Sequence, residues 1–415
     1  MTAAAADLPL SDVRVLDLTR LLPGGFCSLM LADLGAEVLK VEDTGIGDYV
    51  RWAPPYYGSD EQQGLGTRSA LYLALNRGKR SVRLDLKQEQ GREALLRLAA
   101  DYDVLLEGFR PGVLDRLGVG YETLRERNPG IVYCAITGYG QTGPNTDRAG
   151  HDMNYLGLTG LLGLTGEPDG RPIQSAGQIA DVGGGALMAA LAVMAALHER
   201  RRSGEGQLVD VSMTDGALSW LAMAAAQYLC DGRVPRRGDE QLTGGLVCYL
   251  PYEAADGWVT FGALEPKFWA AFCEGVERPD LVDAQFEKPG SETWRELAGI
   301  FRSRTREQWR QFNDRHDAMI EPVLDLDEAL DSELVRSREM VIEMEQPQIG
   351  TVRLLGAPVK FGRTPARPDR PAPALGEHTD EVLLEIGYAD AEIAALKESG
   401  AVAGPSADAA GSFLA

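Results

Sequence analysis

The sequence of 415 residues is poor in the residue types that bind metals and form disulfides. It contains only four histidines and five cysteines, and no two cysteines form a C-x-x-C pair. The spacing of a zinc site is therefore missing, and an odd number of scattered cysteines indicates reduced thiols. We expect no bound metal, and free thiols at Cys27, Cys134, Cys230, Cys248 and Cys273.

Two phosphate-binding signatures are also missing where they would be expected. The first predicted strand, within residues 13–20, is followed by LLPGGFCSLMLADLG rather than by the G-x-G-x-x-G of dinucleotide-binding domains. The P-loop pattern G-x-x-x-x-G-K-[ST] does not occur. These absences argue against an enzyme that uses a nicotinamide cofactor or a nucleoside triphosphate.

Positive charge is scarce and long apolar runs are lacking. Lys and Arg number 41 against 62 Asp and Glu, so the formal net charge is -21. Such a protein repels nucleic acid and anionic membranes. The most apolar stretch, GGGALMAALAVMAALHER, becomes charged before it reaches a membrane-spanning length, and we interpret it as a buried helix. The start, MTAAAADLPLSD, lacks the basic and apolar regions of a secretory signal. We expect a cytoplasmic protein that binds neither nucleic acid nor membrane.

The first half of the chain alternates predicted strands with predicted helices. Strand-like runs lie within residues 13–20, 37–42, 81–86, 103–109 and 130–140, and helical patterns within 24–35 and 89–102. Such alternation predicts an α/β domain with a doubly wound, mostly parallel sheet.

The second half has a different pattern. An Ala-rich helix is predicted over 209–229, a strand pair around an Asp-Gly turn over 247–264, and further helices over 292–319. We predict a large α/β domain over 1–225 and a small α+β domain over 226–332. Residues 333–400 are predicted to return to the large domain, and 401–415 to form a disordered tail.

The segment AGHDMNYLGLTGLLG contains one of the four histidines, His151, directly before a helical run. A helix N-terminus favours the neutral imidazole, which can accept a proton. Alternatively, His151 is structural and Asp152 caps the helix.

Two further segments place carboxylates at helix starts. In QIADVGGGALM, Asp181 precedes three glycines, so a carboxylate and free N–H groups could meet a developing oxyanion. Alternatively, Asp181 is an N-cap and the glycines serve helix packing. In FGALEPKFW, Glu265 precedes Pro266, and read alone it is best explained as a residue that replaces a helix cap.

Basic residues of the first half lie mostly at strand ends and in the turns after them. Open α/β sheets bind ligands at such places, and converging cations would suit phosphates. Alternatively, these are ordinary solvated charges. The residues are Lys40, Arg77, Lys79, Arg80, Lys87, Arg110 and Arg116.

Over residues 9–400 the chain resembles the family III CoA-transferases, the CaiB/BaiF superfamily, and within it most closely the α-methylacyl-CoA racemases. The matching segments include LSDVRVLDLTR, ADLGAEVLKVE, LNRGKRSVRLDLK, LLEGFRPGVLDRLGVGYETL, YCAITGYGQTGP and GEGQLVDVSMTDG. The racemase likeness rests on GHDMNY, IADVGGGALM and GALEPKFW.

The resemblance implies roles for individual residues. His151 and Asp181 would be catalytic, and Glu265 would support His151 across the interface of an interlocked homodimer. CoA, carried by the substrate and the only cofactor implied, would lie against Lys40, Leu84, Lys87, Arg110, Arg116 and Tyr155.

The resemblance implies a racemase that interconverts (2R)- and (2S)-2-methylacyl-CoA thioesters through an enolate. His151 and Asp181 would exchange the α-proton on opposite faces, and N–H groups at Asp181–Gly183 would hold the enolate oxygen. The alternative is a CoA-transferase that forms an aspartyl-CoA intermediate at Asp181. A third possibility, from a different class of protein, is a silent acyl-CoA-binding protein.

Overall fold

The computed structural model describes residues 8–58, 68–366, 368, 370–405, 411 and 413. The chain divides into two compact units. Unit 1 comprises Met1–Thr159, Gly177–Trp220 and Arg336–Ala415, and unit 2 comprises Gly160–Ala176 and Leu221–Val335. An uninterrupted first domain over 1–225 therefore differs from the structure, because the segment 160–176 packs within unit 2.

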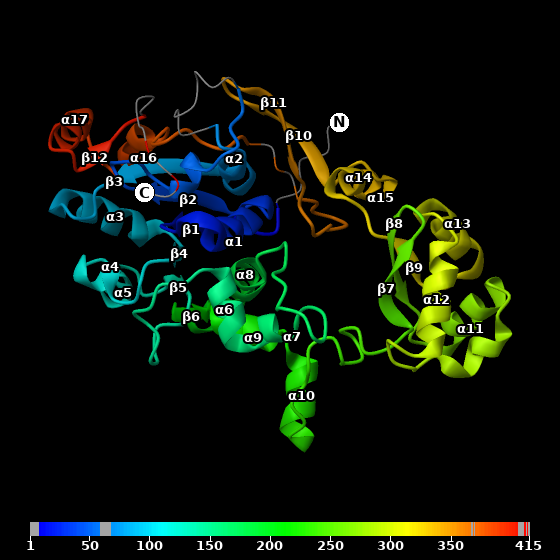
Figure 1. The fold of residues 1–415 in the computed structure, drawn as a ribbon. Coiled ribbons are helices and arrows are strands. Elements are labelled where there is room, and N and C mark those ends of the chain that lie inside the picture. The colour runs from blue at the N-terminus through cyan, green and yellow to red at the C-terminus, as the bar shows by residue number, and fades with distance from the viewer. Residues whose placement is uncertain are drawn as a thin grey trace. The chain divides into compact units, whose positions relative to one another are not determined.

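Unit 1 contains a seven-stranded sheet in the order β12-β3-β2-β1-β4-β5-β6 (Figure 1). All neighbouring strands are parallel except β12, which runs antiparallel to β3. The unit therefore has the expected α/β fold with a large, mostly parallel sheet. The strands are β1 (Arg14–Asp17), β2 (Glu37–Glu42), β3 (Lys79–Leu84), β4 (Val104–Glu107), β5 (Val132–Thr137), β6 (Leu208–Ser212) and β12 (Val402–Ala403).

Successive side chains of a strand point to opposite faces, and helices pack against both faces of this sheet. On one face α3, α5, α16 and α17 form a core with Leu16, Leu39 and Val82. Helices α1 and α8 contact the strands from the other face. The helices of unit 1 are α1 (Leu21–Asp33), η1 (Tyr49–Trp52), α2 (Ala70–Asn76), α3 (Glu89–Asp101), α4 (Val113–Arg116), α5 (Tyr121–Arg127), α6 (Asp152–Thr159), η3 (Ile179–Ala186), α8 (Leu187–Ser203), α9 (Met213–Ser219), α16 (Thr379–Glu385) and α17 (Asp390–Glu398). A hairpin of β10 (Val341–Gln346) and β11 (Gly350–Leu355) packs against α2.

The strand order fixes where a ligand can enter. The chain runs from β1 outward to β2 and β3, and it then returns to place β4 on the other side of β1. Loops that follow β1 and β4 therefore leave the sheet in opposite directions. Open parallel sheets bind ligands in the crevice that opens at this reversal of strand order.

Unit 2 consists of a three-stranded antiparallel sheet, β7-β8-β9, packed on helices. The predicted strand pair is present, but its two-residue turn is Ala255-Asp256, because Gly257 pairs with Ala254 as the first residue of β8. Its core is aromatic, with Trp269, Phe272 and Phe301 all buried. The elements are α7 (Leu161–Leu164), α10 (Ala222–Asp231), β7 (Tyr249–Ala254), β8 (Gly257–Gly262), α11 (Pro266–Gly275), η4 (Pro279–Ala284), α12 (Glu292–Arg302), α13 (Arg306–His316), β9 (Ile320–Pro322), α14 (Leu326–Leu330) and α15 (Glu333–Ser337), the last crossing into unit 1.

Two predictions of local structure are wrong. Residues 209–229 do not form one helix, because 208–212 pair with β5 as the edge strand β6 and the helical part breaks into α9 and α10. The tail is not wholly disordered either, because Val402 and Ala403 pair with β3. In both places a strand forms because its backbone pairs with a distant strand, although the local sequence pattern predicts a helix or a disordered tail. The remainder of the predicted tail, 406–410, 412, 414 and 415, lies outside the described residues.

The apolar helix formed by η3 and α8 is a packed element of unit 1. Residues Ile179–Ser203 are long and apolar enough to cross a membrane by length and composition. Within the described structure they contact α1, α9, β5 and β6, as the core helix of a folded domain does. The interpretation of the segment as a buried helix therefore holds only in part, because 44% of its most apolar window is buried while Leu187, Leu191 and Met194 are exposed.

The glycines of η3 permit a very close approach to α9. A Cβ added at Gly216 would lie 2.1 Å from the carbonyl oxygen of Gly184, and one at Gly184 would lie 2.7 Å from the backbone of Ala217. The atoms that an added Cβ would meet are backbone atoms, which cannot move aside as the end of a flexible side chain can. The two glycines are therefore required by packing.

We predict that Gly216→Ala destabilises the protein by about 1–3 kcal/mol, because the new methyl group meets backbone atoms. Gly157→Ala is the matched control: a Cβ there meets no atom within 4 Å, and alanine favours the helix. Urea unfolding followed by circular dichroism measures both. Equal stability of the two variants would contradict the packing argument.

Candidate functional site

A cavity of about 810 Å³ opens in unit 1 at the carboxyl edge of the sheet. Its walls come from the loops after β1, β4 and β5 and from the segment that leads into α6. It therefore lies at the reversal of strand order described above. Its lining includes Thr19, Arg20, Gly24, Gly108, Arg110, Thr137, Tyr139, Arg148, His151, Asn154, Tyr155, Gln178 and Asp181.

His151 stands directly before α6, in a loop held by several hydrogen bonds. Its backbone N–H donates to the side chain of Asn154 at 2.9 Å. The hydroxyl of Tyr155 donates to the carbonyl of Gly150 at 2.5 Å, and its ring meets Tyr139 edge-on with the centroids 5.2 Å apart. The imidazole itself is exposed, so a substrate in the cavity can reach it.

Asp181 lies in a π-helical turn of η3, a distortion often found at functional sites. The buried carboxylate of Asp152 accepts hydrogen bonds from the backbone N–H groups of Ala180 (2.7 Å) and Asp181 (3.0 Å). Asp152 is the neighbour of His151 in sequence. One carboxylate therefore links the two segments that contribute His151 and Asp181 to the cavity.

Burial raises the pKa of Asp181 to about 6, and the negative charge of Asp152 contributes to the rise, while His151 opposes it. A carboxyl group with this pKa can both donate and accept a proton near neutral pH. The same carboxyl remains available as a nucleophile in its ionised form. The environment of Asp181 thus suits proton transfer without excluding acyl transfer.

The expected oxyanion site at Asp181–Gly183 is only partly available. The N–H of Asp181 donates to Asp152, and the N–H of Val182 donates to the carbonyl of Gln178 at 2.9 Å. A Cβ on Gly183 would lie 2.3 Å from the Trp220 ring. The prediction is therefore wrong for two of its N–H groups, because they are already bonded, and the packing alternative explains the glycines.

Glu265 belongs to unit 2, where it precedes α11 in extended conformation with Pro266 as the first helical residue. Its side chain is exposed and makes no capping hydrogen bond. Glu265 therefore occupies the N-cap position, as the capping explanation predicts, while its carboxylate is not used to bond the helix N–H groups.

Several predicted phosphate contacts are engaged inside the protein. Lys40 is fully buried, with its ammonium 2.8 Å from Asp48 and donating to the carbonyl of Thr19 at 3.0 Å. Leu84 is buried and pairs with β12. Neither has a surface for CoA in this structure, so both expectations are wrong. Arg77 and Lys79 are likewise buried in ion pairs.

Three predicted cations stay exposed: Lys87, Arg110 and Arg116. Of these, Arg110 lines the cavity, together with the predicted Tyr155. Sequence reasoning missed Arg20 and Arg148, although one follows β1 closely and the other precedes His151 by three residues. Sequence reasoning also missed the segment GYGQTG at 138–143, which follows β5 and has the G-x-G-x-x-G spacing. This segment continues into a loop, whereas a dinucleotide-binding site requires a helix there.

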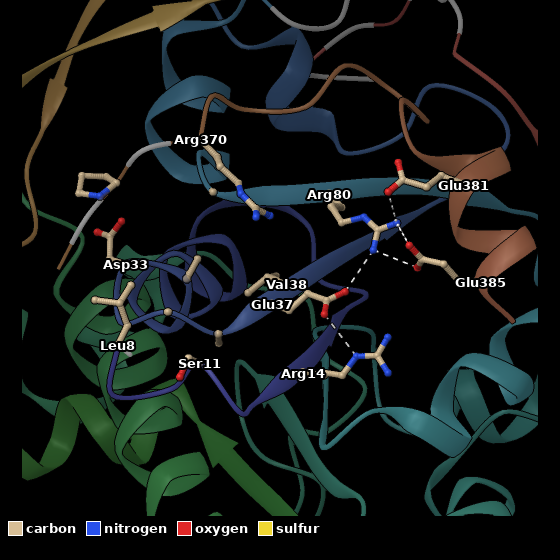
Figure 2. Close-up of a pocket in the computed structure, with 15 residues that line it drawn as sticks. Leu8, Ser11, Arg14, Asp33, Glu37, Val38, Arg80, Arg370, Glu381 and Glu385 are labelled. Carbon is tan, nitrogen blue, oxygen red and sulfur yellow. Dashed lines mark hydrogen bonds and ion pairs between the residues drawn. The ribbon is translucent and has the colours of Figure 1, made fainter. Parts of the chain in front are cut away.

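A second cavity, of about 580 Å³, lies at the opposite, amino edge of the sheet (Figure 2). Two of its three arginines are paired with carboxylates: Arg80 lies 2.8 Å from Glu385, 3.1 Å from Glu381 and 3.1 Å from Glu37, which also pairs with Arg14 at 3.4 Å. Arg370, the third, has no ion pair among the described residues. This charge network ties strands to α16, and we assign no ligand to it.

Comparison with known proteins identifies the family. Residues 10–379 match the family model described as CoA-transferase family III. The chain belongs to CoA-transferase family III. The Alpha-methylacyl-CoA racemase of Mus musculus is 39% identical over 92% of this chain and 95% of its own length. A Succinyl-CoA:mesaconate CoA-transferase of Haloarcula marismortui is 37% identical over 91% of this chain and 96% of its own length.

The fold agrees with the family. A crystal structure of a CAIB/BAIF family protein from Brucella suis superposes with a TM-score of 0.79 at 30% identity, covering 92% of this chain and 100% of that one. Since family III relatives are named both as racemases and as CoA-transferases, family membership alone leaves the reaction open.

The raised pKa of Asp181 makes a prediction for stability. The folded state binds the proton more tightly than the unfolded chain, so this group lowers stability as pH rises from its usual value of 3.8 through about 6. Asp181→Asn should therefore match wild type near pH 4 and exceed it by about 2–3 kcal/mol at pH 8. Urea unfolding across this range measures the difference, and a gain independent of pH would refute the assignment.

Proposed function

We propose that this protein is a 2-methylacyl-CoA racemase, which interconverts the (2R) and (2S) thioesters. The observation that supports it best is the presence of His151 and Asp181 in one cavity at the carboxyl edge of the sheet. Racemisation requires two proton-transfer groups on opposite faces of one carbon. The motifs GHDMNY and GALEPKFW, on which the likeness to the racemases rests, point the same way.

In this mechanism one group removes the α-proton and the C–H electron pair moves to the thioester oxygen, giving an enolate. The other group then returns a proton to the opposite face, and the electron pair returns to carbon. His151 and Asp181 exchange roles with the direction of reaction. Asp152 and Tyr155 hold the two segments in place, so both groups are pre-positioned. We assign the CoA portion of the substrate to Lys87, Arg110 and Arg116.

Glu265 enters the proposal as a residue of the other subunit. In an interlocked homodimer the Glu265 carboxylate of one subunit would pair with His151 of the other and orient its imidazole, as a carboxylate does in a catalytic triad. Its exposed side chain, with no capping bond, is free for such a role.

A CoA-transferase is the second candidate, favoured by relatives named succinyl-CoA:mesaconate and succinyl-CoA:glutarate CoA-transferases. Here the Asp181 carboxylate attacks the thioester carbonyl and expels CoA as a thiolate, which leaves a mixed anhydride between Asp181 and the acyl group. The thiolate then attacks the aspartyl carbonyl, releasing the free acid and leaving an aspartyl-CoA thioester. His151 would have no chemical part.

Hydrogen exchange separates the two reactions. We expect the purified protein, incubated in D₂O with (2R)-2-methylacyl-CoA and no added acid, to lose the α-proton NMR signal and form the (2S) epimer. His151→Gln should slow exchange by at least about 100-fold, since it removes one proton-transfer group. His198→Gln, which changes an exposed histidine outside the cavity, is the control and should leave exchange unaltered. CoA movement to an added carboxylic acid without exchange would establish the transferase instead.

The shared site predicts complementation between subunits. Glu265→Gln and Asp181→Asn proteins should each be nearly inactive, whereas co-refolding them in equal amounts should restore roughly a quarter of wild-type activity, because random pairing makes half the dimers mixed and each mixed dimer has one intact site. Light scattering checks the dimer. Mixtures no more active than their parents would show that Glu265 does not act across subunits.

A further inference from the structure

Arg148 is a cation of the cavity to which neither the family resemblance nor the proposed mechanism gives a task. It lines the same cavity as His151 and Asp181 and is exposed. Among the described residues its guanidinium has no hydrogen bond and no ion pair. Its backbone closes a turn, in which the N–H of Arg148 donates to the carbonyl of Asn145 at 2.9 Å.

The other arginines of the cavity show what distinguishes Arg148. Arg20 is neutralised by Asp43 at 2.8 Å and donates to the Tyr49 hydroxyl at 3.1 Å. Arg110 is unpaired among the described residues, but it belongs to the loop after β4 and is assigned to CoA above. Arg148 comes from a different wall, the loop between β5 and α6.

Arg148 lies close to His151 along the chain and lines the same cavity. It precedes His151 by three residues, so the two Cα atoms lie within about 11 Å. Asp181 also lines the cavity, but the proposed mechanism uses it for proton transfer, and it already interacts electrostatically with His151. It is therefore not assigned as a partner of Arg148. In a chain with a net charge of -21, an unpaired guanidinium beside the catalytic histidine favours a negatively charged group of the substrate.

We propose that Arg148 binds a carboxylate at the far end of the acyl group, so that the preferred substrate is the CoA monothioester of a short 2-methyl-branched dicarboxylic acid. This rests on the proposed function and specifies its substrate class. The planar guanidinium can take a carboxylate through two parallel hydrogen bonds, which fixes the acyl chain as well as attracting it. The α-carbon is then held between the carboxylate anchor and the CoA contacts.

Two thioesters of nearly equal length test the proposal. The 1-thioester of 2-methylglutaric acid ends in a carboxylate where 2-methylpentanoyl-CoA ends in a methyl group. We expect wild type to favour the carboxylated substrate in kcat/KM by at least about 10-fold, and Arg148→Gln to lose roughly 10- to 100-fold on it while changing little on the uncharged one. Arg148→Lys should recover part of the loss. Arg202→Gln, an exposed arginine of α8 outside the cavity, is the charge-matched control.

Calorimetric affinities for both thioesters and for free CoA keep this test independent of turnover. If neither thioester exchanges its α-proton, the proposed function fails, yet a selective loss of affinity for the carboxylated thioester in Arg148→Gln still supports the carboxylate site. Equal losses for both thioesters and free CoA would place Arg148 on a CoA phosphate and overturn it. No loss for any ligand, or no preference of wild type for the carboxylated thioester, would also overturn it.

Discussion

The buried carboxylate of Asp17 holds together the elements that lie under the carboxyl edge of the sheet. It is fully buried at the end of β1, accepts from Ser28 at 2.6 Å and from Lys79 at 3.2 Å, and lies 3.9 Å from Lys40. Burial alone would raise its pKa, but the two ammonium groups and the hydroxyl donors lower it to about 2. The ion cluster ties β1, β2, β3 and α1 together below the loop that forms one wall of the cavity. Such buried charges are stable only as a set, because removing one partner leaves the others unpaired in a medium of low dielectric.

A second buried carboxylate, Asp152, holds the segments of the cavity wall that carry His151 and Asp181. It holds the backbone at the start of η3 while its sequence neighbour His151 faces the cavity, so the spacing between His151 and Asp181 does not depend on loop flexibility. Its charge also keeps Asp181 readily protonated. Asp152 thus fixes the position of Asp181 and adds to the rise in its pKa, of which burial is the larger cause.

At both edges of the sheet some arginines are paired with carboxylates and others are not: Arg20 pairs with Asp43 at the carboxyl edge, and Arg370 at the amino edge has no ion pair among the described residues. At the amino edge, Arg14 and Arg80 are surrounded by glutamates of β2 and α16 and serve cohesion (Figure 2). At the carboxyl edge, Arg110 and Arg148 line a cavity and are unpaired among the described residues. In so acidic a protein, cations left without carboxylates are suited to an anionic ligand. A CoA thioester, with its phosphates, is such a ligand.

Sequence alone was enough to predict the α/β pattern, the change to a smaller α+β part, and the two segments that contribute His151 and Asp181 to the cavity, because these depend on local periodicity and on ordered motifs. The role of Glu265 stays a prediction. The folded structure was needed to show which charges are free. Lys79 is the first residue of β3, and Lys40 lies inside β2 rather than at its end; both are buried against Asp17. Nothing in the sequence distinguishes Arg148, which lines the cavity. Likewise β6 and β12 exist through pairing with β5 and β3, respectively, and the glycines after Asp181 are explained by contact with α9 and Trp220. Burial, pairing and close packing join residues far apart in the chain, and no local pattern records them.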